Sequence, residues 1–170
     1  RFGLFKVAGW TIDTWSLANG TGDEALFLED VQKTREKEEQ MMTGLLADDW
    51  DVYVHYFEFT DRVQHMMYRF LDPKHPAYTA EGAAKYGGSI LAAYKDMDRI
   101  VGQVMTSMPK DAILFVASDH GFVSWRRTMN YNTWLATNGY LVLKGQSTER
   151  ANLEDLFDNT GQFFSTVDWS

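Results

Sequence analysis

The sequence contains no cysteine, no long apolar run and no excess of basic residues, and each absence excludes a class of protein. Without cysteine there are no disulfides, thiolate metal sites or thiol nucleophiles. No apolar run approaches the roughly 20 residues of a membrane-spanning helix, so no membrane segment is expected. The net charge of −8, with no concentrated basic patch, argues against a nucleic-acid polymer as partner. A small phosphorylated substrate stays compatible with this charge, because bound metal ions reverse the local field.

The sequence also lacks a starting methionine and a signal-like segment, since it opens at Arg1 and stops at Ser170. We interpret it as a piece of a longer protein, so the missing targeting segment says little about the compartment; the cytoplasm is slightly favoured. With 170 residues there is room for one domain with a real core. We therefore expect a single domain over residues 1–170.

Hydrophobic periodicity predicts alternating helices and strands. A helix is expected to follow the capping-box pattern at 21–24 and to run to about residue 47, and further helices are expected at 61–70, 80–108 and 131–138. Residues 52–59 and 112–117 are apolar on both faces, as in interior strands of a parallel sheet. The predicted fold class is α/β, a three-layer sandwich with a mostly parallel sheet and helices on both faces.

The first predicted strand runs into Asp61 and His65, which are four positions apart. On a helix this spacing puts a carboxylate and an imidazole on one face, where both can reach a divalent ion. The pattern is weak by itself, but open α/β sheets bind ligands beyond the carboxyl ends of their strands. The other two histidines are assigned to the core, for His55, and to a surface loop, for His75.

The second predicted strand ends in a similar pair, Asp119 and His120, followed by Gly121. The glycine allows a sharp turn in which neighbouring side chains converge on one ion. A local reading stays open, in which Asp119 caps a turn and His120 makes a nearby hydrogen bond. At equivalent positions on two strands, the two pairs together favour a metal site.

Four ligands do not complete two metal sites, because catalytic zinc uses about three protein ligands and water. No other histidine or aspartate is placed convincingly, and Ser118 and Thr60 suit capping or strand-end roles better than that of a nucleophile. The sequence therefore predicts part of a catalytic site, with no catalytic nucleophile in this chain.

Four motifs carry a resemblance to a known family: FEFTDRVQH at 57–65, YRFLDPKHP at 68–76, SDHGF at 118–122 and NTWLATNGYL at 132–141. They resemble the alkaline phosphatase superfamily, in its type I phosphodiesterase/nucleotide pyrophosphatase-like branch, which includes the predicted phosphohydrolase/phosphomutase group. The similarity covers most of residues 23–170.

The resemblance implies two divalent metal ions, zinc or manganese, about 4 Å apart. It implies that Asp61 and His65 bind one ion with a later histidine, and that Asp119 and His120 bind the other with an earlier aspartate and a Ser or Thr nucleophile. The earlier aspartate, the nucleophile and the later histidine have no counterpart in this sequence. Arg126 and Arg127 are weak candidates for phosphate binding, through bidentate hydrogen bonds, and suit a surface role better.

The predicted function is hydrolysis of phosphate esters or diesters by phosphoryl transfer at a two-metal site. This chain is expected to carry part of that site, to bind metal weakly or not at all, and to be inactive alone. The alternatives are a phosphomutase of the same superfamily and a non-catalytic binding or regulatory domain; a sulfate-ester hydrolase is disfavoured. The substrate and the oligomeric state do not follow from the sequence, since specificity lies in loops around such sites.

Overall fold

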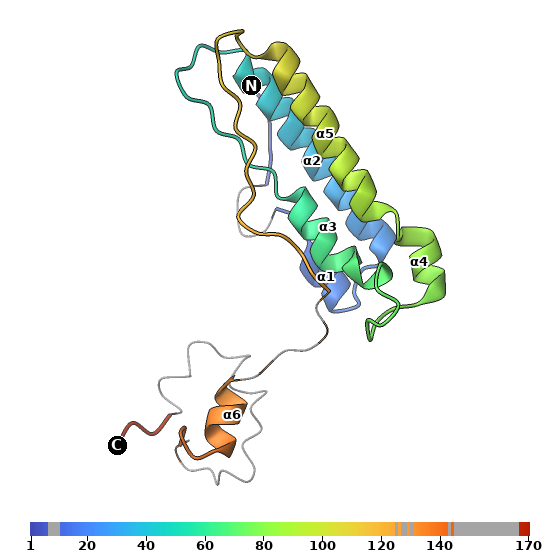
Figure 1. Cartoon of the computed structure of the whole chain (residues 1–170), viewed down its shortest axis with the longest axis vertical. Helices are drawn as coiled ribbons and strands as arrows, with labels where there is room; N and C mark the ends of the chain where they lie inside the picture. The colour runs from blue at the N-terminus through green and yellow to red at the C-terminus, as the bar shows by residue number, and fades with distance from the viewer. Residues whose placement is uncertain (7–10, 125, 127–128, 130, 143, 145–166) are drawn as a thin grey trace. The chain divides into compact units, whose positions relative to one another are not determined.

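A computed structural model describes the chain except for residues 7–10, 125, 127–128, 130, 143 and 145–166 (Figure 1). The chain divides into two compact units, Arg1–Arg126 and Arg127–Ser170. A single domain over residues 1–170 stays a prediction. No helix within the described ranges is long and apolar enough to cross a lipid bilayer.

Two long helices, α2 (Glu24–Leu46) and α5 (Ser89–Ser107), pack side by side in the first unit (Figure 1). The short helices α1 (Thr14–Ala18) and α3 (Phe59–Met67) pack at one end of this pair, and a 3-10 turn, η1 (Tyr68–Phe70), extends α3. The most deeply buried large side chains of the described chain come from α3, α5 and the segment before α1: Phe59, Ile12, Met67, Ile100 and Val63. Helix α3 is therefore anchored by its apolar face, which leaves its polar face to build a site.

Helix boundaries follow the expected signals with small shifts. Asp23 caps α2 by accepting a hydrogen bond from the Leu26 backbone N–H at 2.8 Å, so the cap lies two residues after Thr21. Helix α3 begins at Phe59 rather than at residue 61, which places Thr60 inside its first turn. The predicted helix over 80–108 is divided into α4 (Ala80–Tyr86) and α5, since Gly87 and Gly88 interrupt it.

The prediction of a three-layer α/β sandwich is wrong for the residues that the structure describes, which form helices and no strand or sheet. In residues 52–57 the side chains alternate: Tyr53 and Phe57 pack against the helical core, whereas Val52, Val54 and Tyr56 are exposed. This segment has the period of a strand, but no backbone hydrogen bond joins it to another described segment.

The second predicted strand is likewise absent from the described structure, since residues 113–118 are exposed and make no backbone hydrogen bond to another described residue. Figure 1 draws both segments as irregular traces alongside the helices. Their apolar character on both faces indicated interior strands, yet a sheet requires neighbouring segments that exchange backbone hydrogen bonds. That pairing does not form here, so the outward faces stay uncovered.

In the second unit, α6 (Tyr131–Thr137) confirms the predicted short helix. Gly139 follows it with a φ of 78°, the left-handed conformation in which glycine commonly ends a helix. The apolar side chains of Ala136, Leu141 and Val167 are buried.

Candidate metal and phosphoester site

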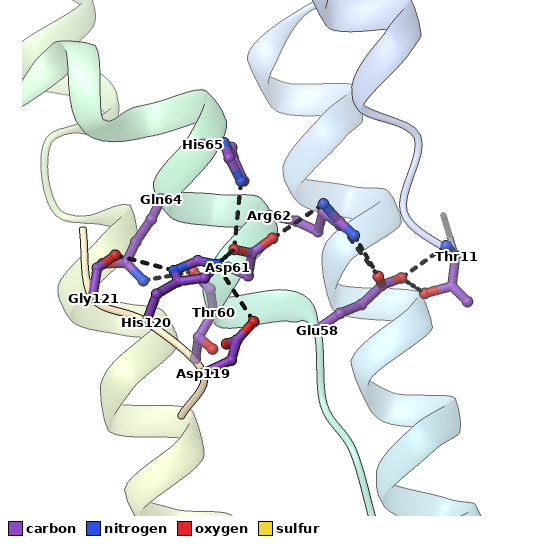
Figure 2. Close-up of polar contacts among 10 residues, drawn as sticks. All are labelled: Thr11, Glu58, Thr60, Asp61, Arg62, Gln64, His65, Asp119, His120 and Gly121. Atoms are coloured by element: carbon purple, nitrogen blue, oxygen red, sulfur yellow. Dashed lines mark hydrogen bonds and ion pairs between the residues drawn. The ribbon is translucent and has the colours of Figure 1, made fainter. Parts of the chain in front are cut away.

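Helix α3 brings the first predicted pair together. Asp61 lies in its first turn and His65 one turn later, so both project from the same face (Figure 2). Asp61 Oδ1 lies 3.4 Å from His65 Nε2. The short helix therefore creates, within nine residues, the carboxylate–imidazole juxtaposition that the sequence spacing indicated.

The second predicted pair reaches the same point from the segment after α5. His120 Nε2 lies 3.8 Å from Asp61 Oδ1 and 3.5 Å from Asp119 Oδ2 (Figure 2). The two pairs thus meet around Asp61, although no sheet in the described part of the chain aligns them. Asp119 is the most exposed of the four side chains.

Local hydrogen bonds orient the His120 ring. Its Nδ1 lies 3.1 Å from the Gly121 carbonyl, and Ser118 Oγ donates to the His120 carbonyl at 2.7 Å. Because a carbonyl only accepts, Nδ1 carries the proton of this bond. In a neutral ring Nε2, which faces Asp61, then holds the free lone pair, as metal-binding histidines require. His120 can therefore make its local hydrogen bond through Nδ1 and still bind a metal ion through Nε2.

Phe122, a residue that the sequence reasoning missed, packs against both histidines. Its ring centroid lies 4.9 Å from that of His65 and 5.5 Å from that of His120. The aromatic ring limits how far either imidazole can rotate. The available signal was an aromatic residue directly after the D-H-G motif.

A second missed feature is a buried ion pair beside Asp61. Glu58 and Arg62 are 6% and 8% exposed, and Glu58 Oε2 accepts hydrogen bonds from Arg62 Nε at 3.2 Å and Nη2 at 3.0 Å. Arg62 Nη1 forms an ion pair with Asp61 Oδ2 at 3.1 Å. The signal in the sequence was the i, i+4 spacing of a glutamate and an arginine.

Of the two candidate phosphate ligands, Arg126 is bound within the protein and Arg127 lies outside the described residues. Arg126 donates to Asp72 Oδ2 through Nε at 2.8 Å, and its Nη2 lies 2.6 Å from the same oxygen. Hydrogen bonds from the Ser124 hydroxyl, the Lys74 backbone N–H and Arg126 lower the pKa of Asp72 to about 2. A phosphate role for Arg126 stays a prediction that requires it to exchange this carboxylate for substrate.

The remaining histidines take other places. His55 is half-buried, its Nδ1 is 3.0 Å from the Tyr53 hydroxyl, and burial lowers its pKa. His75 Nδ1 accepts a hydrogen bond from the Ala77 backbone N–H at 3.0 Å in the loop after η1. His75 lies in the loop that the sequence indicated, whereas His55 is half-buried rather than part of the core.

The donor atoms within each pair are separated by distances close to those around a tetrahedral divalent ion. Two ligand atoms about 2.0–2.1 Å from a tetrahedral ion lie about 3.3–3.4 Å apart. The Asp61–His65 and Asp119–His120 separations, 3.4 and 3.5 Å, are close to that value. Within the described part of the chain, however, no group of three or more His, Asp or Glu side chains is arranged to hold a metal ion. Each Asp–His pair therefore supplies two ligands with a suitable separation, and a metal ion bound there would need further ligands.

Residues 6–163 match the family model of type I phosphodiesterase / nucleotide pyrophosphatase. No curated protein and no solved structure matches the chain. The match includes both Asp–His pairs and nearly the whole sequence, and it supports a function of the phosphoester-hydrolase type. The chain belongs to the type I phosphodiesterase / nucleotide pyrophosphatase family, in the alkaline phosphatase superfamily.

Proposed function

We propose that the chain contributes half of a two-metal site that hydrolyses small phosphate esters or diesters. The single observation that carries this proposal is the meeting of the two pairs at Asp61, whose Oδ1 lies within 3.8 Å of both His65 Nε2 and His120 Nε2. Family membership supports the phosphoester chemistry.

Each pair has a defined task in this proposal. Asp61 and His65 hold one divalent ion, zinc or manganese, and Asp119 and His120 hold the other, since carboxylates and imidazoles suit these ions. When bound, the ions would supply charge stabilisation and activation of the attacking oxygen during in-line displacement. The protein contributes orientation: α3 fixes Asp61 and His65, and the Gly121 carbonyl fixes the tautomer of His120.

The proposal also states that residues 1–170 are inactive alone. The two pairs supply two ligands for each ion, and no described serine or threonine corresponds to the nucleophile that the family resemblance implies. Weak metal binding without turnover is therefore expected.

The test is titration of the chain with Zn²⁺ and Mn²⁺, followed by an aryl phosphodiester assay. Asp61→Asn and His120→Ala should each lower metal affinity by about 10-fold or more, whereas His75→Ala, which alters a surface histidine, should not. Equal binding by all variants would refute the assigned ligands. Robust turnover by residues 1–170 would refute the claim that essential groups are missing, and metal binding with no turnover in any longer form would favour a non-catalytic binding domain.

A further inference from the structure

Asp61 is joined to a buried ion pair, and its two carboxylate oxygens have different surroundings (Figure 2). Oδ2 is paired with Arg62 Nη1 at 3.1 Å. Oδ1 points to the imidazoles of His65 and His120. One oxygen of the carboxylate therefore contacts Arg62, and the other faces the two candidate histidine ligands.

Arg62 is itself held by the rest of the unit. Its Nε and Nη2 donate to Glu58 Oε2, and Glu58 Oε1 accepts from the Thr11 backbone N–H at 2.7 Å and from the Thr11 hydroxyl. Thr11 lies just before α1, 47 residues from Glu58 in the sequence. The orientation of the guanidinium is thus set by Glu58, one helical turn earlier, and Glu58 is in turn held by Thr11 from a distant segment.

A buried ion pair is weak evidence for stability, because desolvation of both charges offsets much of their attraction. Five hydrogen-bond or ion-pair contacts nevertheless connect Thr11 to Glu58, Glu58 to Arg62, and Arg62 to Asp61. Contacts that orient a ligand from behind are a recurring feature of metal sites, where they restrict the ligand to one geometry.

We propose that Arg62, held by Glu58, is a positioning residue that occupies Oδ2 of Asp61 and presents Oδ1 alone to a divalent ion. This inference rests on the proposed function and specifies how its central ligand is set. Binding through one oxygen suits a tetrahedral ion such as Zn²⁺, whereas larger Ca²⁺ ions commonly take both oxygens of a carboxylate. Loss of the ion pair should therefore release the carboxylate to rotate and weaken Zn²⁺ binding.

The test uses a variant that removes both charges, because an unpaired buried charge alone would destabilise the fold. Glu58→Gln combined with Arg62→Met keeps an acceptor for Thr11 and should keep the helical circular dichroism signal. We expect its Zn²⁺ affinity to fall by about 10- to 100-fold. The Arg62→Lys variant keeps the positive charge but lacks the planar guanidinium group. Its Zn²⁺ affinity should lie between that of the double variant and that of wild type.

The matched control is the ion pair of Arg35 and Glu39, which has the same four-residue spacing and similar burial but contacts no candidate ligand among its described partners. Arg35→Met combined with Glu39→Gln should leave Zn²⁺ affinity within about 2-fold of wild type, even where the unfolding midpoint shifts. If Arg62 had a mainly structural role, the two double variants would lose Zn²⁺ affinity to the same extent, in proportion to their loss of stability. That result would overturn the inference.

A metal-free crystal structure of the Glu58→Gln, Arg62→Met variant separates this inference from the proposed function. Rotation of the Asp61 carboxylate away from the imidazoles supports positioning by Arg62, even if wild type binds no Zn²⁺ and the proposed function fails. An Asp61 that keeps its distances to His65 and His120 overturns the positioning role, whatever the metal affinities are.

Discussion

At the residue scale, the side chain with the least ordinary surroundings is Glu38, on α2. Its Oε2 is buried and finds no hydrogen-bond partner among the described residues. Burial, together with the nearby Glu58 carboxylate, raises the pKa of Glu38 from 4.5 to about 7. The folded protein therefore holds a proton on this carboxyl at pH values where the unfolded chain has already released it.

This shift fixes the sign of a pH effect on stability. Between about pH 4.5 and 7 the folded state binds more protons than the unfolded state, so the free energy of unfolding falls as pH rises. Glu38→Gln removes the penalty and should raise the free energy of unfolding at pH 8 by about 1–3 kcal/mol, a range reduced because the carboxyl is only partly buried. At pH 4 the change should be small, as measured by urea unfolding at both pH values.

Glu36→Gln is the control for this prediction, since Glu36 lies two residues away on α2 and is exposed. It should change stability little at either pH. An equal gain from Glu38→Gln at pH 4 and pH 8 would show that the effect comes from packing rather than from ionisation.

The candidate site shows what local sequence can reveal at this scale. The four-residue spacing of Asp61 and His65 determined their proximity once a helix formed, so that juxtaposition was predictable. The D-H-G motif marked the position of Phe122, but its contact with His65 and the contact of Thr11 with Glu58 were not predictable, because the two partners of each contact are distant in sequence. Such contacts depend on how elements pack, which no short motif encodes.

At the element scale, the break between α4 and α5 depends on two glycines with different surroundings. A Cβ added at Gly88 would meet nothing within 4 Å, whereas one at Gly87 would lie 2.5 Å from the Ala83 carbonyl oxygen. Gly88 has φ −82° and ψ −9°, which alanine adopts without strain. The two neighbouring positions therefore form a matched pair for substitution.

Gly88→Ala should raise the free energy of unfolding by about 0.4–1 kcal/mol, because it reduces the conformational entropy of the unfolded chain. Gly87→Ala should lower it, since the backbone must shift to accept the methyl group. Thermal unfolding followed by circular dichroism measures both changes. The same sign for the two substitutions would contradict this account of the α4–α5 junction.

Helices were more predictable than strands for a physical reason. Helices α2, α5 and α6 carry their own hydrogen bonds and apolar stripes, so periodicity and caps predicted α2, α6 and the end of α5, although not the break before α5. A strand is completed only by a partner elsewhere in the chain. Residues 52–57 keep the alternation of a strand without such a partner in the described structure, and the sheet prediction failed there.

At the scale of the whole molecule, residues 52–57 and 113–118 contribute several large apolar side chains to the exposed surface of the first unit. Val54 is 84% and Phe115 85% exposed, and several neighbouring side chains are also exposed: Val52, Tyr56, Ile113 and Val116. Unpaired, β-prone apolar segments are sites of association. The net charge of −8 opposes such association at low ionic strength.

We therefore predict that the chain binds a hydrophobic dye and self-associates more strongly as salt increases, since salt screens the charge repulsion. Val54→Lys combined with Phe115→Lys should reduce both dye fluorescence and light scattering severalfold. Leu91→Lys, at an exposed leucine on α5 outside these segments, is the control and should change little. Equal effects of the two variants would assign the association to general hydrophobicity.

The bond between Glu58 and Thr11 has a practical consequence for anyone who shortens this chain. A clone that begins at α1 would lose Thr11, which donates two hydrogen bonds to Glu58, and also Ile12, one of the most deeply buried side chains. Poor metal binding by such a clone would therefore combine a weakened core with the loss of the Thr11 contact, whereas a substitution at Thr11 in the whole chain would isolate that contact.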